Sequence, residues 1–402
     1  MQNTLFSRYS WVLSIAAGSL VAYLSYTLNI PAFILLLIVF WTYTDKKRDI
    51  FFLVFGYYAM IESYMPSALS KFNVPEVAPL FMAKVFLSTE GWVIVTAHAA
   101  ILALFWIPLF RYRSHHMLML IPLLALPPVG TLNIQNPLLM AGELFPGTGL
   151  LGILLTYWLI VWVVKTCDIM LIVGNPVLYL ARGPLLLFVF LFALTNVNYA
   201  APSAPDGWIA IDTDFGGYVG RDKISVEERN RVLVRKAREA KAKGYRVMVF
   251  PEEVEQYWTA GNQKLWQGKS MEDILPLVGT NIEKSKGLFL DAAVDARSGK
   301  MIARSRVPMP VGNWTLWGDG AESHVLATNV KALAGRRAAM IFCYEDLIVY
   351  PLMFDSFEHP DVIVSMANTW STNNTPAQTM QKESIEWQAR LYHLPLVRAE
   401  NI

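Results

Sequence analysis

The amino-terminal half contains seven apolar runs separated by short polar stretches, and this feature constrains the fold most. The runs lie at about 11–28, 30–44, 51–64, 92–110, 117–133, 148–165 and 183–198. A helix needs roughly 20 apolar residues to cross a bilayer, so we expect some of these helices to be tilted, kinked or partly re-entrant. We therefore predict an α-helical membrane domain of about seven spans at residues 1–199. Because no small-residue cleavage site follows the first run, we expect that run to be an anchor.

Basic residues mark one side of the predicted helices. Lys and Arg at 46–48, 111, 113, 165 and 182 follow or precede alternate runs, so seven spans put them all on the same side. The positive-inside rule makes that side cytoplasmic. We therefore expect a multi-pass inner-membrane protein of a Gram-negative cell, with residues 200–402 in the periplasm.

Charged residues crowd into residues 200–402, where strand-like and helix-like segments alternate. Strands are predicted at 208–211, 246–250, 288–294, 301–304, 338–342, 362–366 and 396–398. One helix is predicted from Ser225, whose capping-box partner is Glu228, to Gly244, and another at 377–392. Such alternation indicates an α/β domain of about 200 residues. The two cysteines, Cys167 and Cys343, are too few for a disulfide framework.

Three polar segments follow predicted strands, and they carry Glu252, Arg304 with Arg306, and Cys343. In α/β sheets, functional sites lie at the ends of the strands. A cysteine attacks as its thiolate, so Cys343 is a candidate nucleophile, helped by the start of a predicted helix, and Glu252 is its candidate base. An arginine and the backbone N–H of Tyr344 would stabilise an oxyanion. Taken alone, a cysteine at a strand end is more often structural.

Two motifs combine to resemble the nitrilase superfamily. Val249-Phe250-Pro251-Glu252 looks like its glutamate motif, and Phe342-Cys343-Tyr344-Glu345 looks like its cysteine motif. The Cys-Tyr-Glu wording, Asn368-Thr369-Trp370 and the segment 395–401 are similar to apolipoprotein N-acyltransferases. That resemblance covers nearly the whole chain. It implies an α-helical polytopic membrane domain, followed at 200–402 by a four-layer αββα nitrilase-like domain with a Glu, Lys, Cys triad. Tyr344, Glu345, Asn368 and Trp370 would support the site.

The sequence departs from that family at three points. The segment 304–313 contains no lysine, so Arg306 or Arg304 takes the lysine position, and an arginine supplies charge but does not readily give up a proton. Asn313 is the nearest match to a supporting glutamate of the family. The acyltransferases continue past the motif at 395–401, whereas this sequence ends at Ile402. With these departures, the sequence resembles a side branch of the family that serves plasmid conjugation.

The resemblance implies acyl transfer or amide-bond chemistry through a thioester on Cys343. Expected partners are a membrane lipid or an acylated or peptide substrate, and proteins of the conjugation apparatus. Amide hydrolysis is the alternative within the enzyme class. A second class is a weakened or inactive domain that binds an acylated or peptide partner. We see no metal-ligand cluster or phosphate-binding loop, and expect no metal or cofactor. The basic run 229–243 alternates with acids, so nucleic acid is not expected.

Overall fold

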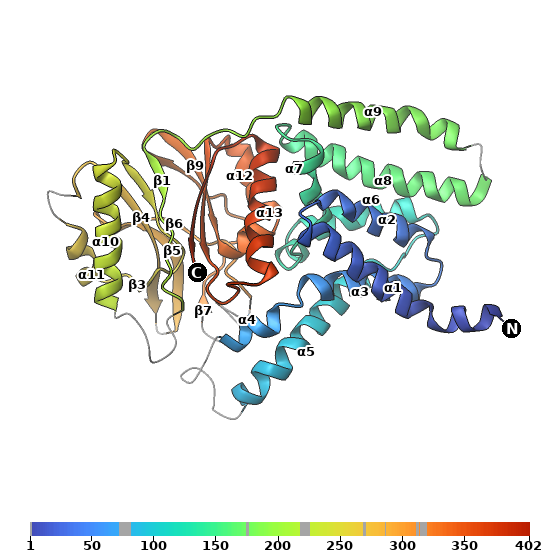
Figure 1. Cartoon of the computed structure of the whole chain (residues 1–402), viewed down its shortest axis with the longest axis horizontal. Helices are drawn as coiled ribbons and strands as arrows, with labels where there is room; N and C mark the ends of the chain where they lie inside the picture. Colours follow the sequence, from blue (N-terminus) through green and yellow to red (C-terminus); the bar gives the residue numbers. More distant parts are fainter. Residues whose placement is uncertain are drawn as a thin grey trace. The chain divides into compact units, whose positions relative to one another are not determined.

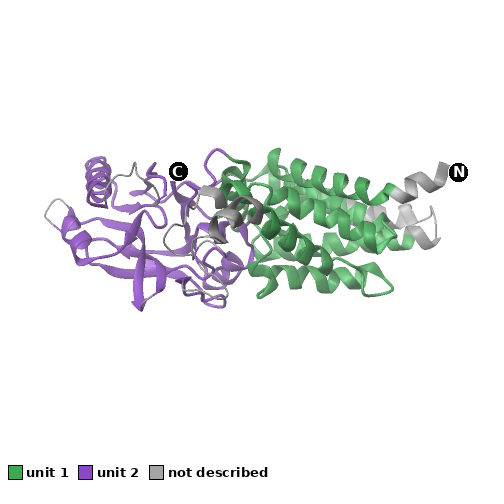
Figure 2. Cartoon of the chain, turned by 90° about the horizontal axis from the view of Figure 1, so that it is seen from below, with its two compact units in different colours: residues 1–70, 78–200, 375–393 green, residues 71–77, 201–374, 394–402 purple. Residues whose placement is uncertain are grey.

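The computed structural model describes residues 2–71, 82–173, 177–217, 226–267, 271–285, 287–310, 313 and 320–402. The chain forms two compact units (Figure 2). Unit 1 contains residues 1–70, 78–200 and 375–393, and unit 2 contains residues 71–77, 201–374 and 394–402. The expected division at 199/200 differs by one residue from the passage between units. Residues 375–393, which we expected in the carboxy-terminal domain, instead belong to unit 1.

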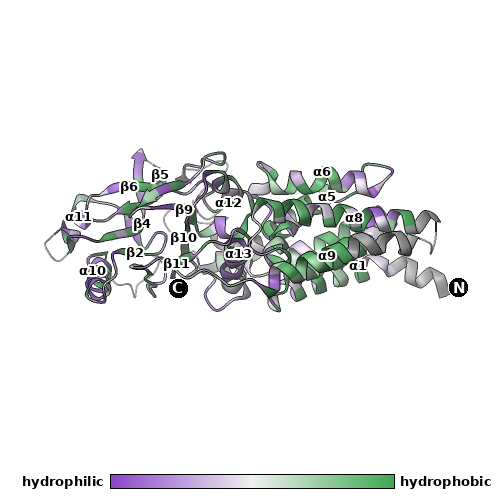
Figure 3. Cartoon of the chain, turned by 90° about the horizontal axis from the view of Figure 1, so that it is seen from above, coloured by the Kyte–Doolittle hydropathy of each residue, from purple (hydrophilic) through white to green (hydrophobic). Residues whose placement is uncertain are grey.

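Unit 1 is helical, and each of the seven predicted apolar runs overlaps one helix. These helices are α1 (Gln2–Thr27), α2 (Ile34–Tyr43), α3 (Lys47–Ile61), α5 (Met82–Phe105), α6 (Arg113–Ala125), α8 (Leu150–Val173) and α9 (Val177–Val197), joined by the short α4 (Met65–Lys71), α7 (Ala141–Leu144), η1 (Pro31–Phe33), η2 (Val129–Thr131) and η3 (Pro137–Met140). Figure 3 shows hydrophobic residues along much of α1, α8 and α9.

Within the described residues, two helical segments are long and apolar enough to cross a membrane, Tyr9–Thr27 in α1 and Leu150–Ile169 in α8. Shorter apolar helical segments lie at Pro31–Tyr43, Gly91–Phe105 and Leu186–Val197. Length and composition alone are compatible with membrane association.

Helices α1 and α3 pack backbone to backbone at two glycines. A Cβ on Gly18 would lie 1.8 Å from the carbonyl oxygen of Leu53, and a Cβ on Gly56 would lie 2.4 Å from that of Ile15. The Ser19 hydroxyl donates to the carbonyl oxygen of Gly56 at 3.1 Å. Small residues that let helices approach this closely are characteristic of membrane helix pairs, where there is no hydrophobic drive to associate.

Contacts bring the basic segments of unit 1 together at one end of its helices. The guanidinium of Arg113, at the start of α6, donates to the carbonyl oxygens of Trp41 and Thr44 at 2.7 and 2.8 Å. The backbone N–H of Ser114 donates to Asp168 Oδ2 at 3.1 Å, near the end of α8. The ends of α2 and α8 therefore meet the start of α6.

The helix α13 (Pro376–Tyr392) completes unit 1 at the start of α8 and the end of α9. The N–H groups of Gly147 and Gly149 donate to the carbonyl oxygens of Arg390 and Leu391 at 2.9 and 2.8 Å. Arg390 Nη2 donates to Asn196 Oδ1 at 2.5 Å. Since α8 starts where α13 binds and ends at the Arg113 cluster, α13 lies at the end of unit 1 opposite the basic residues.

Unit 2 contains two sheets. The first has the order β1-β2-β4-β5-β6, with β3 and β7 pairing β4 and β5. The second has the order β11-β10-β9-β8, in which β9, β10 and β11 are parallel. The bounds are β1 (Trp208–Ala210), β2 (Val247–Val249), β3 (Glu255–Tyr257), β4 (Leu275–Ser285), β5 (Leu288–Asp295), β6 (Lys300–Arg304), β7 (Gly320–Ala321), β8 (Val330–Leu333), β9 (Arg336–Phe342), β10 (Val362–Asn368) and β11 (Leu396–Asn401). Every predicted strand is found, whereas β3, β4, β7 and β8 were not predicted.

The two sheets face each other across one apolar core. Val249 and Leu277 of the first sheet lie in it with Phe342 and Val364 of the second. The other face of the first sheet is covered by α10 (Val226–Ala242) and α11 (Ala260–Trp266), as Figure 1 shows. The short α12 (Tyr350–Asp355) packs against β9. Unit 2 is thus an α/β sandwich in which α12 stands on the second sheet. The predicted cap Ser225 lies outside the described residues.

Candidate active site

Cys343 lies where β9 ends, in a backbone conformation that is unfavourable for a residue with a side chain. Its φ angle is +23°, and such values cost of order 1–3 kcal/mol and persist where the surrounding structure enforces them. Its Sγ donates to the carbonyl oxygen of Asn368, at the end of the neighbouring β10, over 3.6 Å. The expected helix is a 3-10 turn, η5 (Cys343–Leu347), so its dipole is that of a single turn. The thiol is half-buried, unlike that of Cys167.

Glu252 follows β2 in a turn that crosses β4 at a glycine. The N–H of Gly279 donates to the carbonyl oxygen of Pro251 at 3.2 Å. A Cβ at position 279 would lie 2.2 Å from that oxygen and 2.5 Å from the Cα of Glu252. Only glycine leaves room for this approach, so Gly279 determines where Glu252 lies.

The carboxyl group of Glu252 is buried beside that of Asp291 on β5. Burial raises the pKa of Glu252 well above its ordinary value, and the neighbouring Asp291 and Cys343 raise it further. Burial and the charge of Glu253 likewise raise the pKa of Asp291. Like charges this close cannot both ionise easily. The pair therefore keeps a proton at a pH where free carboxyl groups have lost theirs, and it can both donate and accept one.

Arg306, one of the two arginines predicted at the lysine position, has its guanidinium bound by two buried carboxylates. Nη2 lies 3.0 Å from Glu345 Oε2, and Nη1 lies 2.8 Å from Asp355 Oδ1 on α12. The N–H groups of Arg306 and Val307 also donate to Glu345 Oε1, at 2.5 and 3.1 Å. Burial raises the pKa of Asp355 to about 6, against the opposing charge of Arg306. Arg306 and Glu345 thus form a buried ion-pair cluster that ties the loop after β6 to η5 and α12.

Arg304, the other predicted arginine, lies on β6. Its carbonyl oxygen accepts from Asn329 Nδ2 at 2.9 Å. Burial and the positive charge of Arg304 lower the pKa of His324. The charge of Arg304 therefore acts on His324, beyond the end of β7.

The remaining predicted residues have structural partners. Tyr344 is buried in η5. Asn368 Oδ1 accepts from Asn401 Nδ2 at 2.9 Å, and the ring of Trp370 lies 2.6 Å from where a Cβ on Gly217 would be. Asn313 closes a loop, because its N–H donates to Met309 and its carbonyl oxygen accepts from Ala321. Among the residues predicted to support the site, Asn368 contacts the sulfur of Cys343 through its backbone carbonyl oxygen.

Two residues of this region were not predicted. Asp291 is an acidic residue inside an apolar strand, which is itself a signal, because a buried carboxyl group needs a reason. Arg398 on β11 has a side chain that is 8% exposed, with Nη1 2.7 Å from Glu400 Oε2 and Nε 3.5 Å from Asp346 Oδ2. It belongs to the segment 395–401, where the alternation of a strand puts Arg398 and Glu400 on one face.

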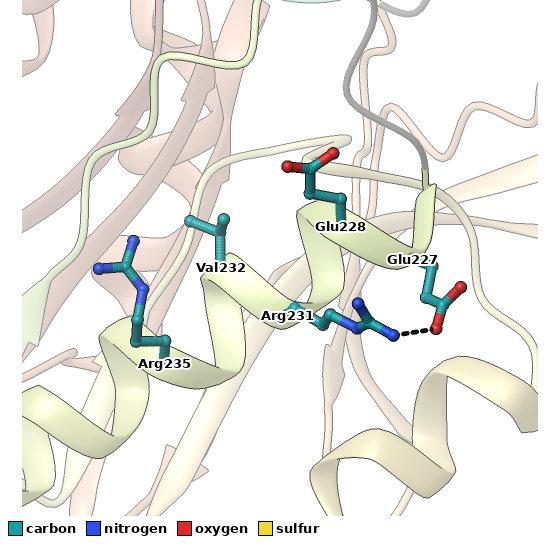
Figure 4. Close-up of a pocket in the computed structure, with 5 residues that line it drawn as sticks. All are labelled: Glu227, Glu228, Arg231, Val232 and Arg235. Carbon is teal, nitrogen blue, oxygen red and sulfur yellow. Dashed lines mark hydrogen bonds and ion pairs between the residues drawn. The ribbon is translucent and has the colours of Figure 1, made fainter.

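A separate depression lies on the surface of α10. Figure 4 shows its lining, Glu227, Glu228, Arg231, Val232 and Arg235, with Arg231 paired to Glu227 at 2.7 Å. It contains none of the predicted site residues. Across the described ranges, no group of three or more His, Cys, Asp or Glu side chains is arranged to hold a metal ion.

Comparison with known structures finds two carbon–nitrogen bond enzymes. A carbon–nitrogen hydrolase from Helicobacter pylori G27 is 13% identical, and the match covers 48% of this chain and 72% of the other with a TM-score of 0.34. An amidase from Nesterenkonia sp. AN1 is 9% identical, with 50% and 79% covered and a TM-score of 0.35. TM-scores this low do not by themselves establish a common fold.

Two conjugal transfer proteins are similar over most of this chain, although no family model matches. The "Probable conjugal transfer protein TraB" of Sinorhizobium fredii is 27% identical over 415 aligned positions, covering 98% of both chains. The "Conjugal transfer protein TraB" of Agrobacterium fabrum is 32% identical over 310 positions, covering 74% of this chain and 68% of that protein. The side branch predicted from the sequence is thus confirmed, and the chain belongs to the TraB family of conjugal transfer proteins.

Proposed function

We propose that this protein is a membrane-bound enzyme of plasmid conjugation that carries an acyl group as a thioester on Cys343. One observation carries the proposal most strongly. The half-buried thiol of Cys343 lies at a strand end in a strained backbone, and its charge acts on the buried Glu252, which lies beside Asp291. The motifs around Glu252 and Cys343 resemble those of nitrilases and apolipoprotein N-acyltransferases. The names of the two relatives support the setting in conjugation.

In the proposed reaction the thiolate of Cys343 attacks the carbonyl carbon of an acyl ester. A C–S bond forms, the C–O bond breaks, and the leaving alcohol takes its proton from the Glu252–Asp291 pair. An amine or water then attacks the thioester and returns a proton to the same pair, while the C–S bond breaks. The raised pKa of Glu252 fits this use, because a group that both gives and takes a proton works best with a pKa near the operating pH.

The proposed membrane arrangement has unit 1 as a multi-span domain of the inner membrane. It is supported by the seven helices, by the glycine contacts of α1 with α3, and by the gathering of basic segments at one end of unit 1. If that end is cytoplasmic, α13 lies at the periplasmic end, and along the chain α13 follows β10 and precedes β11. The domain after residue 200 is then periplasmic.

A membrane lipid is the proposed acyl donor. Unit 1 contains an apolar cavity of about 130 Å³ near the end of α1 and the start of α13, lined by Ala22, Tyr23, Tyr26, Thr27, Met60, Ile61, Ser63, Tyr64, Pro376, Ala377 and Met380. Such walls suit part of a hydrocarbon chain. The acceptor is an amine or peptide of the conjugation apparatus, or water.

The test is acyl transfer from lipid to protein. The full chain is incubated with phospholipid vesicles whose acyl chains carry an alkyne tag, and the tag is followed on the protein. We expect hydroxylamine-sensitive labelling that is lost in Cys343→Ala and reduced in Glu252→Gln. Cys167→Ala is the matched control and should label normally. A protein that never acquires the tag on Cys343 contradicts the proposal.

A binding domain is the second candidate function, and one observation favours it. Arg306, one of the two arginines expected at the lysine position, is bound by Glu345 and Asp355, and the positive charge of Arg304 acts on His324. Loss of the lysine would then have left a domain that binds an acylated or peptide partner. Plasmid transfer at the full rate by a strain carrying Cys343→Ala would favour binding over catalysis.

A further inference from the structure

Arg398 lies on the face of the second sheet that points away from the core between the sheets, because its neighbours Val397 and Ala399 lie in that core. In the parallel ladder β9-β10-β11, Ile341 pairs with Ser365 and Ser365 pairs with Arg398. Residues in register on neighbouring strands point to the same face, and side chains two residues apart do too. Cys343 follows the last residue of β9 directly, so the sulfur lies at the end of this ladder, two residues beyond Ile341.

The side chain of Arg398 reaches across the sheet toward the turn that carries the sulfur. Its Nε lies 3.5 Å from Oδ2 of Asp346, three residues after Cys343 in η5. Asp346 is fixed in turn by the Ser365 hydroxyl, which donates to Asp346 Oδ1 at 2.9 Å. Ser365 stands between Ile341 and Arg398 in the ladder. The contact with Asp346 therefore places the guanidinium beside η5.

Arg398 is buried, and its hydrogen-bonding capacity is only partly satisfied. Nη1 binds Glu400 at 2.7 Å and Nε forms the ion pair with Asp346, whereas Nη2 has no hydrogen-bond partner among the described residues. An unpaired buried donor costs about 1–3 kcal/mol, more for a charged group, so a structure retains one where it serves something. Burial lowers the pKa of Arg398, but the charges of Asp346, Glu400 and Cys343 outweigh burial and raise it. The arginine and the thiolate therefore favour each other's charge.

We propose that Arg398 supplies the positive charge that stabilises the thiolate of Cys343, as a positioning residue that acts through the sulfur. The proposal rests on the proposed role of Cys343 as the nucleophile. The other charged groups are Glu252, which interacts with Cys343, and Asp346 and Glu400, which form ion pairs with Arg398. Glu252 opposes the thiolate only when ionised, and burial disfavours that form. Arg398 thereby fills, from another strand, the electrostatic place of the missing lysine.

The experiment measures ionisation of the thiol and needs no substrate. In the full chain carrying Cys167→Ala, the rate of Cys343 alkylation by iodoacetamide is followed from pH 5 to 10. We expect half-maximal reactivity below pH 8.5, the value of a free thiol. Arg398→Gln should slow alkylation about tenfold at pH 6–7 and move the midpoint upward, since an opposite charge shifts a pKa by roughly one unit or more. Arg398→Lys should restore most of the rate, and Arg304→Gln, the matched control, should change nothing.

An unchanged midpoint in a folded Arg398→Gln protein would overturn the inference. If that variant does not fold, Glu400→Gln provides the second test, because removing a competing carboxylate should speed alkylation at pH 6–7; an equal or slower rate would also overturn it. The proposed function fails separately. A thiol whose ionisation depends on Arg398, in a protein that never acquires an acyl tag, would keep this inference and remove the acyl chemistry.

Discussion

Unit 2 contains two groups of ionisable side chains. In the first, opposite charges compensate each other, and in the second, acidic groups crowd together. The framework cluster consists of Arg306, Glu345 and Asp355, and its arginine lies within 3.0 Å of both carboxylates. The reactive cluster consists of Glu252, Asp291 and Cys343. It brings two carboxyl groups and a thiol together, and burial raises the pKa values of both carboxyl groups.

The difference separates what holds the site from what reacts in it. The framework cluster binds three segments, the loop after β6, η5 and α12, through charge-assisted hydrogen bonds. The reactive cluster contributes unfavourable terms, a φ angle of +23° and crowded carboxyl groups. We infer that the first offsets the cost of the second, as is usual when a structure holds a strained functional residue. The predictions below test that division.

The largest expected effect is on the framework cluster. Arg306→Met would leave Glu345 and Asp355 buried without their cation, and breaking a buried pair in this way costs about 3–5 kcal/mol. We expect the free energy of unfolding, measured by pulse proteolysis in detergent, to fall by that amount. Arg304→Met on β6 is the matched control and should stay within about 0.5 kcal/mol. If both variants are equally stable, the cluster is not the framework.

The next effect concerns the position of Glu252. Gly279→Ala would put a Cβ 2.2 Å from the Pro251 carbonyl oxygen, so the turn carrying Glu252 must move. A displacement near 1 Å lowers rates about 100-fold, and we expect that loss in the rate of acyl-tag transfer to Cys343. Gly261→Ala, in α11 with an ordinary 3.5 Å neighbour, should leave the rate unchanged. Normal labelling in Gly279→Ala would show that Glu252 need not be held so closely.

In the reactive cluster, removing a charge should stabilise. Because the pKa of Glu252 is raised in the folded protein, the stabilisation by its proton is complete below pH ~4.3 and is lost as the pH rises through the raised pKa. Glu252→Gln stays neutral, so we expect it to be more stable than the parent at pH 8 by about 1–2 kcal/mol, and equal near pH 4. Glu239→Gln, on the exposed face of α10, should track the parent at every pH. A less stable Glu252→Gln at pH 8 would contradict the comparison.

The smallest effect tests the strained backbone of Cys343. Cys343→Gly and Cys343→Ala both remove the sulfur, but only glycine adopts a φ angle of +23° without strain. After allowing for the greater freedom of glycine in the unfolded chain, we expect Cys343→Gly to be more stable than Cys343→Ala by about 1 kcal/mol. Urea unfolding of the two variants measures this. The opposite order would mean that the turn is relaxed.

Much of the fold follows from patterns that sequence reasoning reads directly. Apolar runs predict the helices of unit 1, and short apolar segments ending in polar residues predict β2, β9 and β10. The strand β4 was missed because Pro276 and Gly279 interrupt its pattern. Gly279 is needed because the turn that carries Glu252 crosses β4 at that position.

The candidate site is harder to predict, because sequence proximity alone does not decide which cation serves it. Arg306 stands near the family lysine position, yet two acidic residues from η5 and α12 bind it. Arg398 comes from the far end of the chain, and the parallel register of β9, β10 and β11 brings it to Asp346, in the turn that begins with Cys343. Local sequence patterns do not predict how distant strands pair. That pairing determines which charged side chains lie close together.

The membership of α13 in unit 1 has a consequence for how the protein is made. Synthesis runs from the amino terminus, so the helices of unit 1 emerge long before residues 375–393. Gly147, Gly149 and Asn196 must wait for their partners Arg390 and Leu391 until α13 has been translated. Neither unit can finish folding before the chain is nearly complete, and a gene fragment for residues 200–402 would express one unit together with a displaced piece of the other.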